Sequence, residues 1–488
     1  MLLVYIPLVS LVFVIYVKWR LNYWKRRGLF QLDPEFFFGN TRNEVLGSVS
    51  KFEVFRDRYL YIKSVNRKQC GMYAFLDPWY LPVDHQIIKN ILQRDFSYFE
   101  NHGMYHHEKD IVSMNLFNIE GEAWKQLRVK LTPSFSSLKI KTMFQILLDK
   151  TTILEKIIHS YSSENEPINI KDMMRRFTSD VIASCGFGVE ANSMEDPDNE
   201  FTRVGMEAFY PGLLKFFLIE TFPAGLLANL GLRSNGYKTS KFFSDLVTQT
   251  LQYREKNSIS RSDFLQLLLE LKRNKTMTDN EIIAQCFIFF IAGFETSSTT
   301  AMFAMLELAQ NEGIQNKLRD EIRSVLGKHG GDLCCDAVME MEYLDKIVNE
   351  TLRKFPPGAV IPRRCTKTYK VPGTEVVIEK GTRVIIPVWG LHRDPEFYPN
   401  PEEFNPENFS TENKAKRPDI AYIPFGEGPR MCIGLRFGVL QTKLALIALL
   451  RNFKHTLNSR TKTPIEIDPE AIFVLNIKGD VWLNVSKV

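Results

Sequence analysis

A single cysteine, placed in a glycine-rich loop just before an apolar helix, constrains the fold of this chain more than any other feature of its sequence. The loop reads Phe425-Gly426-Glu427-Gly428-Pro429-Arg430-Met431-Cys432-Ile433-Gly434, and a hydrophobic stretch follows from Leu435 to Asn452. Glycines let a backbone pass close to a flat macrocycle, and the N-terminus of a helix stabilises negative charge. Both features favour a thiolate at Cys432. Bound to haem iron, such a thiolate would promote O–O bond cleavage.

A long apolar helix is the second strong prediction. Thr278 and Glu281 form a capping box, and the largely apolar stretch that follows runs without proline to about Gln310. Helical patterns dominate the rest of the chain, with short strand-like segments such as Cys70–Pro82 and Arg383–Val388 between them. The sequence therefore predicts a mainly α fold with a minor β component.

The middle of this apolar helix carries residues that packing alone does not explain. Ala292, Gly293, Glu295 and Thr296 lie close together there, although burying an acid and an alcohol is costly without a function. Gly293 is expected to loosen the helix and leave space for dioxygen, Thr296 to position water for proton delivery, and Glu295 to relay protons. The alternative is a helix kink in which the threonine hydroxyl bonds back to the preceding turn.

The cysteine loop matches the pattern F-x-x-G-x-R-x-C-x-G at every specified position, and the chain therefore resembles the cytochromes P450. The pattern A/G-G-x-E/D-T of the same family is also matched in the apolar helix. The resemblance implies the cytochrome P450 fold around a buried haem b. It implies that Cys432 is the axial ligand of the haem iron, that Arg430 holds a propionate and that Phe425 packs near the thiolate. Gly426 and Gly434 belong to the same haem-binding loop.

Further haem and substrate contacts follow from the same resemblance. Trp124 and Arg128 lie four residues apart on one helical face, so both could reach one haem edge. The alternative is a core tryptophan beside a solvated arginine. Arg363 resembles another propionate-binding arginine, although its neighbour Arg364 leaves the register open. Phe117 lies in a region that borders the substrate in the family, and is a candidate substrate contact.

Glu350 and Arg353 match the E-x-x-R pattern of the family. Residues at this spacing on a helix usually form an ordinary surface ion pair, whereas in the family the pair locks the fold behind the haem. We therefore interpret it as structural rather than catalytic. The family often completes this lock with an arginine, but the present chain has Asn408, which donates hydrogen bonds without a charge. The strength of the lock is therefore in question.

The N-terminus predicts a membrane anchor. The first 17 residues are apolar except for Ser10, and a segment with five basic residues and three aromatic residues follows up to Arg27. We expect residues 1–27 to form the anchor with its basic flank and residues 28–488 to form the catalytic domain. The basic flank predicts a single anchor with the catalytic domain on the cytosolic face. The resemblance to the cytochromes P450 implies that the membrane is that of the endoplasmic reticulum. A buried N-terminal core helix is the alternative.

Composition excludes some classes of function. The 62 basic and 57 acidic residues give a formal charge of +5, which is too small to indicate a nucleic-acid partner, and no nucleic-acid motif is present. The seven cysteines form no C-x-x-C pair, which favours a reducing environment. His102, His106 and His107 lie in a polar loop and are expected to be solvated rather than to bind a metal.

The segment from Trp124 to Phe135 resembles the microsomal P450 clan that contains the insect family 6 and vertebrate family 3 enzymes. This likeness implies a monooxygenase that uses O2 to oxidise lipophilic small molecules, either xenobiotics or endogenous compounds such as hormones and fatty acids. Electrons would come from NADPH through NADPH-cytochrome P450 reductase, with cytochrome b5 as a second candidate partner. Two alternatives are a haem-thiolate isomerase or dehydratase acting on peroxides, and a non-catalytic carrier of haem or hydrophobic ligands.

Overall fold

The computed structural model describes residues 2–488, and the chain divides into two compact units. Unit 1 contains the residues up to Gly103 together with Ala359–Pro401 and Pro418–Met431, and unit 2 contains Met104–Gly358, Glu402–Arg417 and Cys432–Val488. Helices take up 56% of the chain and strands 9%, which confirms the prediction of a mainly α fold with a minor β component. The predicted boundary after residue 27 stays a prediction.

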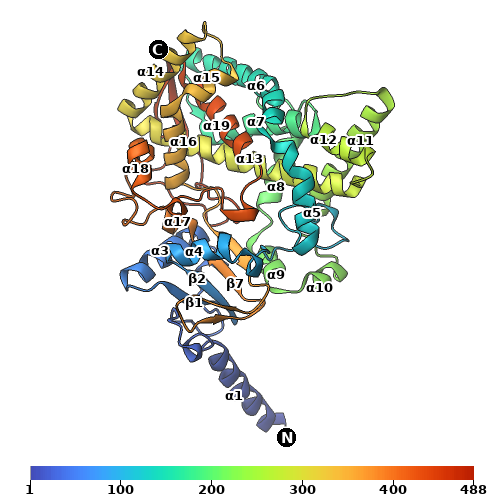
Figure 1. Cartoon of the computed structure of the whole chain (residues 1–488), viewed down its shortest axis with the longest axis vertical. Coiled ribbons are helices and arrows are strands. Elements are labelled where there is room, and N and C mark those ends of the chain that lie inside the picture. The colour runs from blue at the N-terminus through green and yellow to red at the C-terminus, as the bar shows by residue number, and fades with distance from the viewer. Residues whose placement is uncertain (1) are drawn as a thin grey trace. The chain divides into compact units, whose positions relative to one another are not determined.

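Unit 1 is built on a four-stranded sheet with the strand order β1-β2-β7-β4 (Figure 1). Strands β1 and β2 lie in the predicted strand-like segment Cys70–Pro82 and pair in antiparallel fashion, with Gln69 opposite Pro82 and Ala74 opposite Asp77. The elements of unit 1 are α1 (Leu2–Arg20), α2 (Arg42–Val45), α3 (Lys51–Ser64), β1 (Gln69–Ala74), β2 (Asp77–Pro82), α4 (His85–Lys89), β4 (Ile361–Arg364), β5 (Tyr369–Lys370), β6 (Val377–Ile378), β7 (Arg383–Ile386) and α17 (Val388–Leu391).

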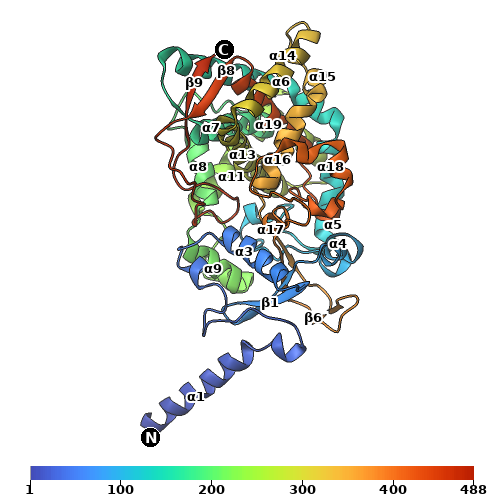
Figure 2. The same ribbon diagram turned by 90° about the vertical axis from the view of Figure 1, so that its left-hand side faces the viewer.

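Helix α1 extends away from this sheet within unit 1 (Figures 1 and 2). Most of its apolar side chains between residues 8 and 16 are exposed, for example Val9 at 65% and Ile15 at 58%. At its base the chain turns back, and Val17, Leu21 and Trp24 join the core of unit 1. The helix is thus apolar on its outside, which the hydrophobic effect disfavours in water.

Unit 2 is mainly helical, with a small sheet in the order β3-β9-β8. Its elements are α5 (Gly121–Leu131), α6 (Ser137–Glu164), β3 (Ile168–Asn169), α7 (Ile170–Ile182), α8 (Glu200–Phe209), α9 (Leu213–Thr221), α10 (Ala224–Asn229), α11 (Tyr237–Asn257), α12 (Phe264–Arg273), α13 (Asp279–Gln310), α14 (Glu312–Lys328), α15 (Cys335–Glu340), α16 (Glu342–Lys354), α18 (Thr411–Ala415), α19 (Leu435–Leu450), β8 (Phe453–Leu457) and β9 (Trp482–Lys487).

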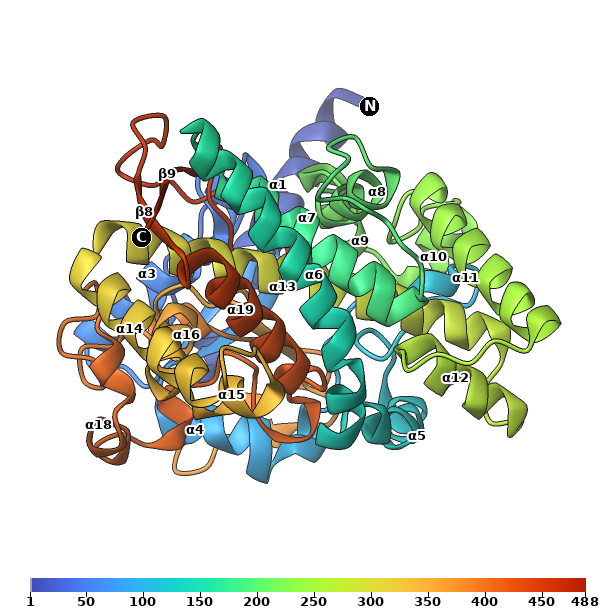
Figure 3. The same ribbon diagram turned by 90° about the horizontal axis from the view of Figure 1, so that it is seen from above.

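Helix α13 forms the centre of unit 2 and packs against α7, α19, α11, α12 and α16. Figure 3 shows α6 and α19 lying side by side above it. The predicted capping box is present, because Thr278 accepts the amide proton of Glu281 and the Glu281 carboxylate accepts that of Thr278. Helix α13 is long and apolar enough to cross a membrane, but 67% of its apolar window is buried inside the protein. It is therefore a core helix.

Candidate active site

The part of the cysteine loop that belongs to unit 1 contains two glycines that its backbone conformation requires. Gly426 and Gly428 have φ angles of 73° and 74°, in the left-handed region that favours glycine. A Cβ atom at Gly428 would collide with the carbonyl oxygen of Leu92. The loop therefore lies directly on the π-helical turn η2 (Asn90–Arg94), while Phe425 and Gly426 stay partly accessible.

Cys432 follows this loop in unit 2, just before Gly434 and the start of α19. Its side chain is accessible. Burial nevertheless raises the pKa of its thiol, while the amide of Gly434 and the charge of Arg128 lower it. The sulfur is thus accessible, yet its surroundings disfavour a negative charge on it. We expect this combination where a side chain lines a space inside the protein. A bound metal ion would reverse this balance, because a coordinating thiol is deprotonated.

Trp124 and Arg128 lie on α5 within unit 2. Trp124 is buried at 3% exposure, and Arg128 is half-buried. Burial lowers the pKa of Arg128, and the charge of Cys432 opposes that shift, so the guanidinium lies within electrostatic reach of the sulfur. The fold thus brings α5 to the cysteine although the two are far apart in the sequence.

Two arginines of unit 1 are buried near each other. Arg363 on β4 is 1% exposed, and Arg430 is 8% exposed, whereas Arg364 is exposed to solvent. Burial and then the charge of Arg430 lower the pKa of Arg363 to about 9. Within residues 2–488 the Nε of Arg363 has no hydrogen-bond partner, and its Nη1 donates to the carbonyl of Pro362 at 2.9 Å. A buried cation short of an acceptor fits an anionic group such as a haem propionate.

Helix α13 has one accessible stripe. Ile288, Ile291, Ala292 and Thr296 recur at helical spacing and are exposed or half-buried, whereas most of their neighbours on the helix are buried. The stripe is apolar apart from one hydroxyl group. It therefore suits a flat ligand and an apolar substrate, which would cover it.

Thr296 makes the back-bonded contact that the sequence left as an alternative. Its hydroxyl donates to the carbonyl of Ala292 at 2.5 Å. Helix α13 is unbroken at Gly293, contrary to the predicted loosening. The reason is packing, because a Cβ atom at Gly293 would collide with Ile182 of α7. The glycine lets α7 and α13 approach closely.

Glu295 is buried and fully engaged. Arg175 of α7 donates to it twice, from Nε to Oε2 at 3.1 Å and from Nη2 to Oε1 at 2.6 Å. The side-chain amide of Asn476 donates to Oε1 at 2.6 Å. A bidentate pair of this kind is strong and geometrically specific. Glu295 can therefore relay a proton only after one of these bonds opens.

Glu350 and Arg353 are 0% exposed, so the alternative of an ordinary surface ion pair is wrong. Arg353 donates from Nε to Oε2 at 2.8 Å and from Nη2 to Oε1 at 2.7 Å. The backbone amide of Asn405 and the side-chain amide of Asn408 also donate to Oε1, at 2.8 Å and 3.1 Å. Asn408 thus contributes a hydrogen bond where the family often has a charge.

Phe117 lies beside α13, and 41% of its surface is exposed. Gln285 of α13 bonds to the segment that contains Phe117. Its side chain accepts from the amide of Leu116 at 2.9 Å and donates to the carbonyl of Met114 at 3.4 Å. Gln285 precedes the accessible stripe by about one turn. The candidate substrate contact and the stripe are therefore neighbours.

The loop histidines correct one prediction. His102 is 5% exposed, so the expectation of a solvated side chain is wrong for this residue, whereas His106 and His107 are half-buried and keep partial access to solvent. The loop folds onto itself, because the amide of His107 donates to the hydroxyl of Ser113 at 3.0 Å and His107 bridges to Asp110. Among residues 2–488, no group of three or more His, Cys, Asp or Glu side chains could hold a metal ion.

Some site residues were missed by the sequence analysis. Arg175 and Asn476 hold Glu295, Gln285 holds the Phe117 segment, and Asn405 holds Glu350. None lies within a motif, and each acts on a residue distant in the sequence. A polar residue in an otherwise apolar helix was the one signal in the sequence that could have indicated such a contact. Of these four residues, only Gln285 shows it.

Comparison with known proteins identifies relatives of the whole chain. Residues 58–483 match the family model described as Cytochrome P450. The chain is 39% identical to cytochrome P450 6A1 of Musca domestica, over 97% of this chain and 95% of that protein. It is 38% identical to cytochrome P450 6a8 of Drosophila melanogaster, over 97% of this chain and 96% of the relative.

Proposed function

The chain belongs to the cytochrome P450 family of haem-thiolate monooxygenases, and on this premise we propose that it oxidises lipophilic small molecules with electrons that originate from NADPH. Xenobiotics are one substrate class, and endogenous hormones and fatty acids are another. The observation that carries the substrate proposal is the apolar accessible stripe of α13, which offers a ligand almost no polar contact.

In unit 2, Cys432 would bind the haem iron, and Arg128 and the indole N–H of Trp124 would bind a propionate. In unit 1, Arg363 and Arg430 would bind propionates. Phe425, Gly426 and Gly434 belong to the loop that would approach the macrocycle. When bound, the haem supplies the iron at which dioxygen is activated. The fit rests on the buried Arg363, whose Nε has no hydrogen-bond partner among the described residues, and on the accessible thiol of Cys432, whose pKa burial raises and a bound metal ion would lower.

Thr296 carries the single hydroxyl group in the accessible stripe of α13. It holds a water for proton delivery by rotating away from the carbonyl of Ala292, to which it now donates. Glu295 joins the relay if Arg175 or Asn476 releases an oxygen. Gly293 keeps α13 close to α7 and so fixes the position of the threonine. Phe117 and the isoleucines of the stripe orient the substrate.

The electrons come from NADPH through NADPH-cytochrome P450 reductase, and cytochrome b5 is a second donor. Because the enzyme needs O2 and external electrons, each turnover consumes NADPH. The enzyme acts at the cytosolic face of the endoplasmic reticulum, with α1 as a single anchor. The exposed apolar side chains of α1 support this location, because water would not tolerate such a surface without a partner.

The base of α1 is fixed to the sheet of unit 1. Trp24 is 0% exposed and fills the space beside Gly71, where a Cβ atom would collide with the indole. Glu379 accepts from the hydroxyl of Tyr23 at 2.8 Å and from Arg27 at 2.6 Å. These contacts support an anchor with a defined direction although the segment lacks the usual series of prolines.

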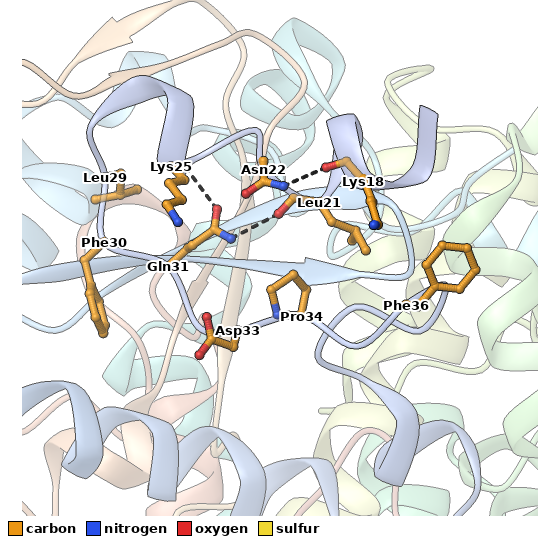
Figure 4. A pocket seen from close by; sticks show the side chains of 10 residues that line it. All are labelled: Lys18, Leu21, Asn22, Lys25, Leu29, Phe30, Gln31, Asp33, Pro34 and Phe36. Atoms are coloured by element: carbon orange, nitrogen blue, oxygen red, sulfur yellow. Dashed lines mark hydrogen bonds between the residues drawn. The ribbon is translucent and has the colours of Figure 1, made fainter. Parts of the chain in front are cut away.

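A recess of about 450 Å³ lies beside this base (Figure 4). The side chain of Gln31 crosses it, accepting from the amide of Lys25 at 3.0 Å and donating to the carbonyl of Leu21 at 3.0 Å. Lys18 and Phe36 also line it. Basic and aromatic groups of this kind suit the headgroup region of a membrane.

A reduced, carbon monoxide difference spectrum of the full-length protein tests the thiolate. We expect a thiolate-type band that is lost in Cys432→His. A product screen with reductase, NADPH and lipophilic substrates then tests the reaction. Turnover of hydroperoxides without NADPH would favour an isomerase or dehydratase, and haem binding without any turnover would favour a carrier; either result would overturn the proposal.

A further inference from the structure

The cysteines other than Cys432 fall into two groups. Cys70, Cys185, Cys286 and Cys365 are buried, and burial raises the pKa of each thiol, to about 12 for Cys70 and about 11 for Cys365. Cys334 and Cys335 are partly accessible. Reactivity of a thiol follows its access and its ionisation, so chemistry at cysteine outside the haem loop concentrates at this adjacent pair.

The pair lies where the turn after α14 leads into α15 (Figure 2). Gly330 and Gly331 have φ angles of 68° and 89°, which glycine alone adopts readily. The amide of Gly331 donates to the carbonyl of Leu326 at 2.8 Å and closes the turn. This tight turn brings the side chain of His329 back to Cys334.

Cys334, His329 and Glu340 form a hydrogen-bonded chain. The Sγ of Cys334 lies 3.6 Å from Nδ1 of His329, and Nε2 of His329 lies 3.1 Å from Oε1 of Glu340. Because the carboxylate accepts from Nε2, the neutral imidazole carries its proton there and leaves Nδ1 free to accept the thiol proton. The amide of Ala337 donates to Sγ at 3.4 Å, so the sulfur contacts a backbone donor as well as the imidazole.

Cys335 lacks this arrangement and is an internal comparison. Burial raises the pKa of its thiol, the charge of Lys141 lowers it, and the charge of Asp336 raises it. Lys141 and Asp336 are themselves paired at 3.4 Å, and their effects on the pKa of the Cys335 thiol have opposite signs. Two adjacent thiols of similar access thus differ mainly in contact with a histidine.

We propose that Cys334 is an activated thiol that forms mixed disulfides with small disulfides, with His329 as the base and Glu340 as the group that orients it. The thiol proton passes to Nδ1 of His329, and the sulfur attacks one sulfur of the disulfide. The S–S bond of the reagent breaks as the new S–S bond forms. The departing thiolate takes the proton from His329, so the exchange needs no further oxidant.

The full-length holoenzyme is treated with glutathione disulfide, and the modified cysteine is identified by peptide mass mapping. We expect Cys334 to react at least about tenfold faster than Cys335, and His329→Gln and Glu340→Gln to slow it by a similar factor. Cys335→Ser should leave the rate at Cys334 unchanged. Equal rates at both thiols, or no slowing in His329→Gln, would overturn the proposal.

Folding is checked separately, so that loss of reactivity is not confused with loss of structure. The carbon monoxide difference spectrum should be the same for every variant, because none of these residues belongs to the haem site. In denaturant, where the geometry is absent, Cys334 and Cys335 should react at rates within about twofold of each other. A rate difference that persists in denaturant would trace to local sequence and contradict the role of the folded turn.

Discussion

Asn408 donates a hydrogen bond of 3.1 Å to Glu350, and thereby joins the buried ion pair of Glu350 and Arg353 without adding a charge. The carboxylate then has donors from Arg353, from the amide of Asn405 and from Asn408. A buried charge is tolerated where hydrogen bonds replace water. Asn408, which stands where the family often has an arginine, therefore still donates a hydrogen bond to Glu350.

Removing these partners should lower stability to different extents. Asn408→Ala is expected to cost about 1 kcal/mol, because one of several donors is lost, and Glu350→Gln about 3 kcal/mol or more, because Arg353 is left as an uncompensated buried charge. Thermal unfolding of the holoenzyme measures both. Lys416→Ala, which breaks the exposed pair with Glu412, is the control and should change stability by less than about 0.5 kcal/mol.

Glu295→Gln separates two roles of that carboxylate. Because Arg175 and Asn476 occupy it, the substitution should lower the free energy of unfolding by about 3 kcal/mol, with the ratio of product to NADPH kept within about twofold. Chemical denaturation and coupling measurements are made on the same preparation. A large loss of coupling in protein that remains folded would show that Arg175 or Asn476 releases an oxygen of Glu295 during turnover, so that the carboxylate joins the proton relay.

Thr296→Ala should uncouple the reaction. Product per NADPH is expected to fall at least about tenfold while NADPH consumption continues, because the hydroxyl that positions water is lost. Thr300→Ala is the matched control, since Thr300 makes the same back-bond one turn later on α13, to the carbonyl of Thr296 at 2.8 Å, but is 4% exposed. Equal uncoupling in both variants would trace the effect to the helix and not to the hydroxyl.

Arg363→Leu should weaken haem retention. The buried guanidinium is short of an acceptor without haem, and a charge-assisted hydrogen bond to a propionate contributes about 1.5–3 kcal/mol, or roughly 10- to 100-fold in affinity. The apoprotein should gain stability, because the substitution removes a buried charge. The lowered pKa of Arg363 indicates that burial destabilises this charge in the folded protein. Transfer of haem to apomyoglobin measures retention, and Arg364→Leu, at an exposed position, should change it little.

His455 predicts a loss of stability in acid. Burial lowers its pKa to about 4, and its Nε2 lies 2.7 Å from the carbonyl of Leu449. The unfolded chain therefore binds more protons than the folded one between about pH 6.5 and about pH 4. The free energy of unfolding should fall as the pH decreases through this window, by up to about 3 kcal/mol.

Urea unfolding from about pH 7.5 to about pH 4.5 measures this dependence. In His455→Gln, which keeps an amide donor but does not titrate, the acid side of the stability profile should become flatter. A profile identical to that of the unchanged protein would show that other groups dominate the acid transition.

Sequence by itself determined the parts of this protein that local patterns encode. The loop around Cys432 needs glycines in fixed places, and the capping box of Thr278 starts a helix whatever lies around it, so both could be predicted with their chemistry. The strand segment that contains β1 and β2 was predicted from its alternating pattern, and the core helix α13 from its capping box and an apolar stretch without proline.

Only the tertiary structure decided which side chains meet across long separations. Arg175 holds Glu295, Arg363 rather than Arg364 is the buried arginine, and Asn408 reaches Glu350, because the packing of distant segments selects these partners. It also showed Ile182 beside Gly293. A sequence fixes spacing along one element, but the identity of a buried partner depends on how elements pack, and that choice is made by the whole core.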